Sequence, residues 1–200
     1  IVQDNGEGMT LTTVENIWLI PGDDHREKQR IARQRTPKYH RLPLGEKGLG
    51  RFAVHKLGDT IRLITRAQGE YECVVEIDWR SLIAVQYLDN APVTIRTREP
   101  AVFKGSQTGT RIEIGDLRQD GWTRGEVRRL FKQITSICSP FEAPGSFVAK
   151  LIVPQAEHWL EDLPDTIEIR NRAPWKFTFK VNADGGLEWS YSFRQIAGVK

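Results

Sequence analysis

The chain has 200 residues, which is enough for one large domain or for one domain and part of a second. Hydrophobic residues make up 39% and charged residues 28%, and no apolar run reaches the ~18 residues that a membrane span needs, so we expect a soluble globular protein with no membrane partner. The two cysteines form no Cys-x-x-Cys pair, which argues against a disulfide framework or structural zinc and favours a reducing, cytoplasmic location. The chain opens on Ile1 without a signal-peptide pattern, and we expect it to be part of a longer protein.

The net charge is only +3, but the basic residues are unevenly distributed. The segment 25–41 holds seven Lys and Arg residues and a single acidic residue, Glu27, a local charge of +6. It has few apolar residues, and Pro37 and Pro43 interrupt any long helix. The sequence therefore predicts a mobile surface loop with about one helical turn, and a solvated loop is the simplest interpretation.

The first 58 residues alternate short elements with glycine turns. Residues 1–4 look like the end of a buried strand, followed by a glycine turn and by a helix from about Thr10, its predicted N-cap, to Leu19. After the basic segment, a second glycine-rich stretch leads into a short helix over 49–57, with Gly58 predicted as its C-cap.

From Asp59 the hydrophobic pattern changes to a period of two, which predicts a largely antiparallel sheet with strands around 61–63, 71–77, 93–95 and 111–114. Thr123 and Glu126 form a capping box for a helix over about 124–138, whose apolar stripe is Val127, Leu130, Phe131, Ile134 and Ile137. Beyond the break at Pro144, we expect further strands at 147–153, 166–169, 177–181 and 189–193.

Three short motifs occur in order: Asp4-Asn5-Gly6-Glu7-Gly8-Met9, Gly45-Glu46-Lys47-Gly48-Leu49-Gly50-Arg51-Phe52, and Thr108-Gly109-Thr110-Arg111-Ile112. Each is weak alone, because Asp-Asn-Gly is also a common hairpin turn. Their order, the basic segment between the first two, the helix start after Gly48 and the strand position of the third make the set specific.

In this arrangement the chain resembles the GHKL ATPase superfamily of gyrases, heat-shock chaperones, histidine kinases and mismatch-repair proteins, over roughly residues 1–141. The resemblance implies the Bergerat ATP-binding fold, an α+β two-layer sandwich in which helices cover one face of a mixed, mostly antiparallel sheet, with additional strands after it. We expect an ATP-binding domain over 1–146 and, over 147–200, the start of a β-rich transducer or middle domain or an extension of the sheet.

The first and third motifs fit adenine recognition. An ionised Asp4 at a strand end can accept the exocyclic amine of adenine and has no proton to offer the carbonyl of guanine. Gly6 and Gly8, ahead of Met9, let a ring approach the backbone without a Cβ in the way. The hydroxyl of Thr110 can hold a water or the adenine edge.

The second motif fits phosphate binding. Gly48 and Gly50 leave amides bare at a helix start, where the helix dipole attracts anions. Lys47 and Arg51 could add charge there, although solvated surface residues are the simpler interpretation of both. Leu49 and Phe52 complete the motif. Residues 48–53 also match the dinucleotide pattern G-x-G-x-x-A, but a Pro-containing loop precedes them in place of a buried strand, so we reject a Rossmann fold.

The resemblance also implies Mg²⁺ with ATP or ADP, and a general-base Glu and a magnesium-binding Asn on a helix before the first motif. Only three residues precede Asp4, so we expect that helix upstream; no catalytic or metal-binding residue is assigned within 1–200. The segment from about Pro21 to Lys47 is the expected nucleotide lid, ordered by γ-phosphate and released by hydrolysis, in a protein that forms an ATP-dependent homodimer.

Two other functions remain open from the residues. The chain could be the ATP-binding domain of a histidine kinase, although no phosphoacceptor helical hairpin is in view and the long lid is more similar to chaperone, mismatch-repair and Microrchidia-like members. It could also be a nucleic-acid-binding module that uses 25–41 on backbone phosphates. A DNA or protein client is compatible with either, and the task of the whole protein is not determined by a shared nucleotide site.

Overall fold

The structure, a computed structural model, describes residues 1–20, 25–41, 49–84, 93–119, 121–138, 147–163 and 172–194. Their contacts divide the chain into two compact units, Ile1–Asp120 and Gly121–Lys200, each of which is described separately.

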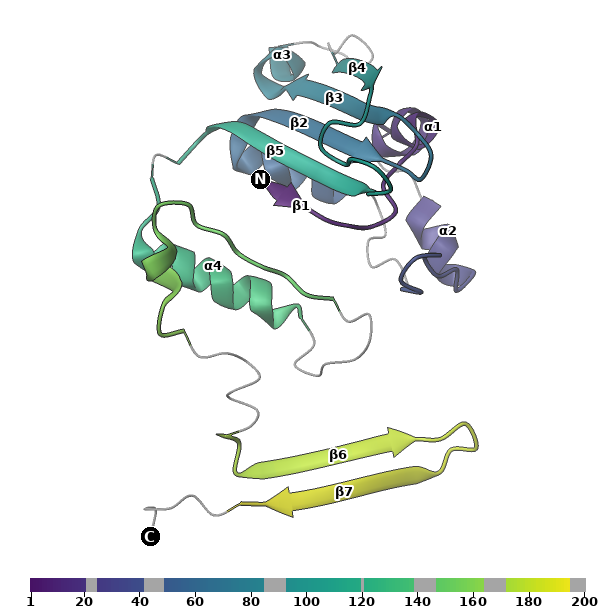
Figure 1. The fold of residues 1–200 in the computed structure, drawn as a ribbon, viewed down its shortest axis with the longest axis vertical. Helices are drawn as coiled ribbons and strands as arrows, with labels where there is room; N and C mark the ends of the chain where they lie inside the picture. Colours follow the sequence, from purple (N-terminus) through teal and green to yellow (C-terminus); the bar gives the residue numbers. More distant parts are fainter. Residues whose placement is uncertain are drawn as a thin grey trace. The chain divides into compact units, whose positions relative to one another are not determined.

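The first unit is built on a five-stranded sheet with the order β1-β5-β2-β3-β4 (Figure 1). Its strands are β1 (Val2–Gln3), β2 (Gly58–Arg66), β3 (Glu72–Asp78), β4 (Val93–Arg98) and β5 (Gly109–Leu117). Every pairing among these strands is antiparallel. The α+β fold is confirmed, with a described sheet that is antiparallel throughout where a mixed one was expected.

One face of this sheet is apolar and lies against helices. The helices of this unit are α1 (Leu11–Thr13), the π-helix η1 (Val14–Trp18), α2 (His25–Ile31), the 3₁₀ helix η2 (Leu49–Lys56) and α3 (Trp79–Ala84). Val14 of η1 is fully buried, and Val54 of η2 packs on the same cluster. The buried cluster consists of Val14, Ile61, Leu63, Cys73, Val75, Ile77 and Trp79. Alternation along β2 and β3 produces this core, because every second side chain points to the same face.

The opposite face carries charged side chains over most of its area. Arg62 of β2 lies between Glu76 of β3 and Glu113 of β5, at N–O distances of 3.3 and 3.5 Å. At the end of this face near the β4–β5 loop, a second small core is formed by Ile64, Val74 and Phe103. The sheet therefore has two different sides. Helices cover one side, and the other is a charged surface on which the β4–β5 loop packs.

Several local expectations are wrong in detail. The first strand is exposed, with Val2 at 65%, because β1 is a two-residue strand at the edge of the sheet, and β5 is its one partner among the described residues. The basic segment begins with a helix of seven residues, α2, which ends ahead of Pro37. Gly58 is no left-handed C-cap; it is the first residue of β2, where a Cβ would come within 2.3 Å of the carbonyl oxygen of Gly115.

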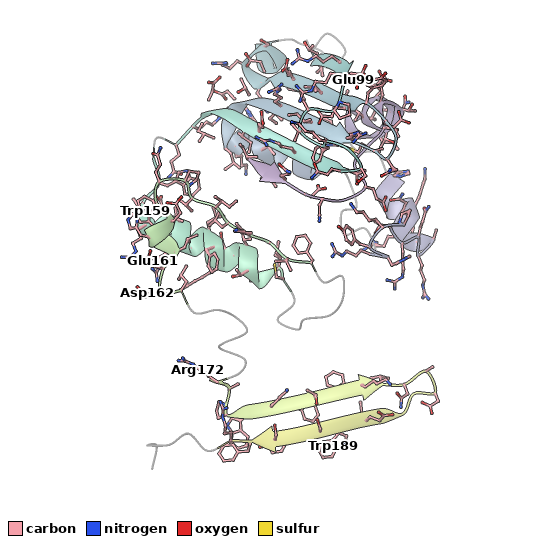
Figure 2. The ribbon with its side chains drawn as sticks, in the orientation of Figure 1. Glu99, Trp159, Glu161, Asp162, Arg172 and Trp189 are labelled. Carbon is pink, nitrogen blue, oxygen red and sulfur yellow. The ribbon has the colours of Figure 1, made fainter. Side chains whose placement is uncertain are left out.

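The described residues of the second unit include the helix α4 (Arg124–Ser136) and the short 3₁₀ helix η4 (Glu157–Leu160). The predicted capping box of α4 is confirmed. The Thr123 side chain accepts from the amide of Glu126, whose carboxylate accepts from the amide of Thr123. Only Val127 of the predicted stripe is buried, and Ile137 is 69% exposed. Arg128 donates to the carbonyl oxygens of Trp159 and Glu161, which lie beside α4 (Figure 2).

The end of the described chain is a hairpin of β6 (Trp175–Val181) and β7 (Leu187–Phe193). Two of the predicted later strands are thus confirmed. Residues 147–153 form no strand, because no partner pairs with them among the described residues, and 166–169 lie outside the described residues. Every odd-numbered residue of the hairpin is apolar and exposed, including Trp189, labelled in Figure 2. No helix in the described part of the chain is long and apolar enough to cross a membrane.

Candidate functional site

The Asp4 side chain holds the turn that follows β1. Its Oδ1 accepts a hydrogen bond from the amide of Gly6 at 2.8 Å and another from the amide of Thr110, on β5, at 3.1 Å. The Asp4 amide in turn donates to the carbonyl oxygen of Thr110 at 2.9 Å. Asp4 is exposed, and no described residue bonds its second oxygen, Oδ2, which leaves an oriented acceptor at the sheet edge.

A buried hydroxyl ties this turn to the centre of the sheet. Thr65 of β2 is fully buried, and its Oγ1 accepts from the amide of Met9 at 2.9 Å and donates to the carbonyl oxygen of Gly109 at 3.1 Å. The hydroxyl of Thr110 lies 3.1 Å from the same atom. Since the Thr65 proton goes to Gly109, the Thr110 hydroxyl is the donor of that third bond. Thr65 therefore joins the first motif to the third.

Two glycines let three backbone segments meet at this point. Gly8 has a φ of +70°, and a Cβ on it would lie 1.9 Å from the carbonyl oxygen of Arg66. Gly109 has a φ of +152°, and its Cβ would lie 2.3 Å from the carbonyl oxygen of Asp4. Both positions combine a backbone conformation that favours glycine with a contact that has no room for a side chain.

The basic segment makes direct contact with the same turn. The ammonium of Lys38 donates to the carbonyl oxygens of Asn5 and Gly6, at 2.5 and 3.2 Å, and to the hydroxyl of Thr108 at 3.1 Å. The Lys38 amide donates to the Glu7 carboxylate at 3.0 Å. Thr108 also donates to the carbonyl oxygen of Gly6 at 2.6 Å. The carbonyl side of the turn is therefore held by Lys38 and Thr108, and its amide side by Asp4.

The second motif lies only partly in the described structure. Lys47 and Gly48 are outside the described residues, and Leu49, Gly50, Arg51 and Phe52 form the first turns of η2. This element is a 3₁₀ helix where an ordinary helix was expected, so its amide spacing is tighter. η2 contacts β2 through the sheet face that carries the core.

The structure brings together Asp4, Gly6, Gly8, Met9 and Thr110, as the sequence motifs predicted. It adds three residues that the motifs did not single out as binding residues: Thr65, Thr108 and Lys38. Thr65 was missed because a threonine in a strand is ordinary, and Lys38 because its charge was counted with the rest of its segment. Among the described residues, no group of three His, Cys, Asp or Glu side chains could hold a metal ion, so no magnesium ligand is assigned.

Comparison with known proteins agrees with this geometry. The family model described as "Histidine kinase-, DNA gyrase B-, and HSP90-like ATPase" matches residues 1–110, which span β1 to the start of β5 and include both the Asp4 turn and Thr110. No curated protein matches the chain significantly. The chain therefore belongs to the GHKL-type ATPase family, whose domains bind ATP.

Proposed function

We propose that the Asp4 turn reads the adenine of ATP or ADP. The observation that carries this proposal is the Asp4 carboxylate, whose Oδ1 is fixed by the amides of Gly6 and Thr110 while Oδ2 receives no hydrogen bond from any described residue. A fixed acceptor of this kind suits the exocyclic amine of adenine and rejects the carbonyl of guanine. The hydroxyl of Thr110, which donates to Thr65, keeps acceptor capacity on the neighbouring strand.

We propose further that nucleotide controls the segment from about Pro21 to Lys47 as a lid, in a protein that hydrolyses ATP and dimerises when ATP is bound. Lys38 supports this role, because it links the segment to the carbonyls of Asn5 and Gly6 in the first motif. A change in the Asp4 turn on nucleotide binding would thus reach the lid through a direct contact. Phosphate binding by Lys47, Gly48, Gly50 and Arg51, with Mg²⁺ supplied by the nucleotide complex, completes the proposed site.

The nucleic-acid alternative receives less support from these contacts. Lys38 is engaged by the turn, and Tyr39, the single aromatic residue of the segment, has Lys38 and Arg41 over its ring at 5.3 and 4.6 Å from the centroid. A base that stacks on this ring would compete with these cations. Histidine kinases are part of the same family, so a histidine kinase function remains a second candidate. Of the two, we favour the ATPase.

Calorimetric titration of magnesium-ADP into the protein tests the adenine site, with magnesium-GDP as the competing base. Asp4→Asn keeps Oδ1 for both amides but replaces Oδ2 by a donor, so we expect ADP affinity to fall about tenfold or more. Asp184→Asn is the matched control, because Asp184 also accepts the amide two residues ahead, from Gly186 at 2.9 Å, but lies in the β6–β7 turn. Equal binding of ADP and GDP by the wild type would overturn the adenine site.

A further inference from the structure

The loop between β4 and β5, residues 99–108, is anchored on the charged face of the sheet by a buried carboxylate. Glu72 of β3 is fully buried, and its Oε1 accepts from the amides of Val102 and Phe103, both at 2.6 Å. Its Oε2 accepts from Arg98, its cross-strand partner on β4, at 2.9 Å. A buried charge is stable only with such a set of donors, so Glu72 fixes the backbone of this loop closely.

The half-buried guanidinium of Arg66 holds the later part of the same loop. The Nη1 of Arg66 donates to three carbonyl oxygens of the loop, at 2.8 Å to Phe103, 2.6 Å to Gly105 and 3.2 Å to Gln107. Its Nε donates to the carbonyl oxygen of Glu70 at 2.8 Å. Glu72 therefore holds amides of the loop while Arg66 holds its carbonyls.

This loop leads directly into β5, at the point where β5 contacts the Asp4 turn. The Phe103 ring is buried, and its Cε1 would lie 2.9 Å from a Cβ on Gly109. Gly109 packs against the Asp4 backbone and pairs with Arg66 in the β2–β5 ladder. The last loop residue, Thr108, donates to the carbonyl oxygen of Gly6 at 2.6 Å. The start of β5, and with it the Thr110 amide that orients Asp4, is thus placed by the loop.

We propose that Glu72 and Arg66 are positioning residues for base recognition, acting through the 99–108 loop from the sheet face opposite the helices. They touch no nucleotide themselves; they set where Gly109 and Thr110 lie and so the direction in which Asp4 presents Oδ2. This inference rests on the proposed adenine site and adds to it a determinant of specificity outside the three motifs. We call Glu72 and Arg66 the clamp. When the clamp is lost, the Asp4 carboxylate is still present, but its direction is no longer fixed.

The test compares ADP with the diphosphate of purine riboside, which lacks the 6-amino group. The ratio of the two affinities isolates the contact between Asp4 and the amine. A substitution that only lowers the stability of the fold affects both affinities alike and leaves this ratio unchanged. We expect a ratio of about ten in the wild type and a fall of about threefold or more in both Glu72→Gln and Arg66→Lys. The matched controls are Glu76→Gln and Arg62→Lys, which change the same residue types four positions away on the same strands and the same face.

The outcomes separate the two proposals. A reduced ratio in the clamp variants, with an unchanged ratio in the controls, supports positioning. Clamp variants that melt at a lower temperature yet keep the wild-type ratio overturn it, because the clamp would then only stabilise the fold. A wild-type ratio of one means that Asp4 does not read the amine, and the proposed adenine site fails together with this inference. If Glu72→Gln does not fold, Arg66→Lys decides, since it keeps the positive charge but replaces the guanidinium, which donates from both Nε and Nη1, by a single ammonium.

Discussion

The carbonyl oxygen of Arg66 occupies the place where a side chain on Gly8 would begin, because a Cβ there would lie only 1.9 Å from it. Both atoms of this contact belong to backbones that neighbouring hydrogen bonds hold in place, since Thr65 holds the amide of Met9 and Arg66 pairs with Gly109. The first motif therefore needs its last glycine for packing as well as for conformation.

Replacing Gly8 by alanine should destabilise the first unit by about 3 kcal/mol or more, because the left-handed φ and the clash with Arg66 add together. Gly69→Ala is the matched control: its φ is +77°, but no atom lies within 4 Å of the added Cβ, so about 1 kcal/mol is expected. Urea unfolding measures both values. Equal losses in the two variants would show that the close contact has no cost.

Replacing Thr65 by valine should cost about 1–3 kcal/mol, since the new methyl group leaves the Met9 amide without its acceptor in a buried position. The same variant should weaken ADP binding, because the Thr110 hydroxyl loses its partner. Thr65→Ser keeps the hydroxyl and should retain most of the affinity. Chemical denaturation and calorimetric titration give the two readouts, and a Thr65→Val protein that binds ADP like the wild type would contradict the assigned role.

Replacing Lys38 by methionine removes the charged donor that links the basic segment to Asn5 and Gly6, with little change in side-chain length. Exchange at the Lys38 amide, bonded to Glu7, should become roughly three to ten times faster by hydrogen–deuterium exchange. Lys132→Met, on the exposed side of α4, removes an equal charge and should leave that rate unchanged. An unaltered rate in Lys38→Met would show that the side chain does not hold the segment.

Acid should weaken the contacts that Glu72 makes as a carboxylate. Burial by itself raises the pKa of the Glu72 carboxyl, but hydrogen bonds from the amides of Phe103, Ala101 and Val102 and from Arg98 outweigh it, and the pKa lies below its ordinary value. A depressed pKa means that the carboxylate contributes stability above about pH 4.3, the ordinary value, and loses it as the pH falls through the lower folded-state pKa.

The unfolding free energy of the wild type should therefore drop more steeply as the pH falls below about 4.3 than that of Glu72→Gln, which has no carboxylate to protonate at this position. Urea titrations at half-unit pH steps measure the two slopes. Parallel slopes would show that Glu72 is not held as a carboxylate.

Strands β2 to β7 and the α4 capping box were predictable because they depend on local patterns, and the first and third motifs could be recognised from their own residues. The hydrophobic period of two along 61–63 and 71–77 predicts strands, and the Thr-x-x-Glu pattern at Thr123 predicts a helix N-terminus. Both patterns involve residues that are close in the sequence. Long-range relations were not accessible in this way. Glu72 looks like an ordinary polar residue of a strand until Val102 and Phe103, about thirty residues later, bring their amides to it.

The wrong predictions also depended on contacts with residues that are distant in the sequence. Residues 147–153 are mostly apolar, like a buried strand, but pair with no described segment. Gly58 was interpreted as the cap of the preceding helix, although its contact with Gly115 determines the requirement for glycine. Lys38 belongs to a run of seven similar charges, and only the fold distinguishes the one that reaches the Asp4 turn.

The pairing of β1 with β5 joins residues more than a hundred positions apart, since the Asp4 contact to the Thr110 amide spans 106. β2 and β3 instead meet across a short turn. Closing a long loop carries the larger entropic cost, so we expect the β2–β3 hairpin to assemble early in refolding and the Asp4 turn to dock last. Competence to bind nucleotide would then report that folding of the whole sheet is complete, and added nucleotide would slow the reopening of that final pairing.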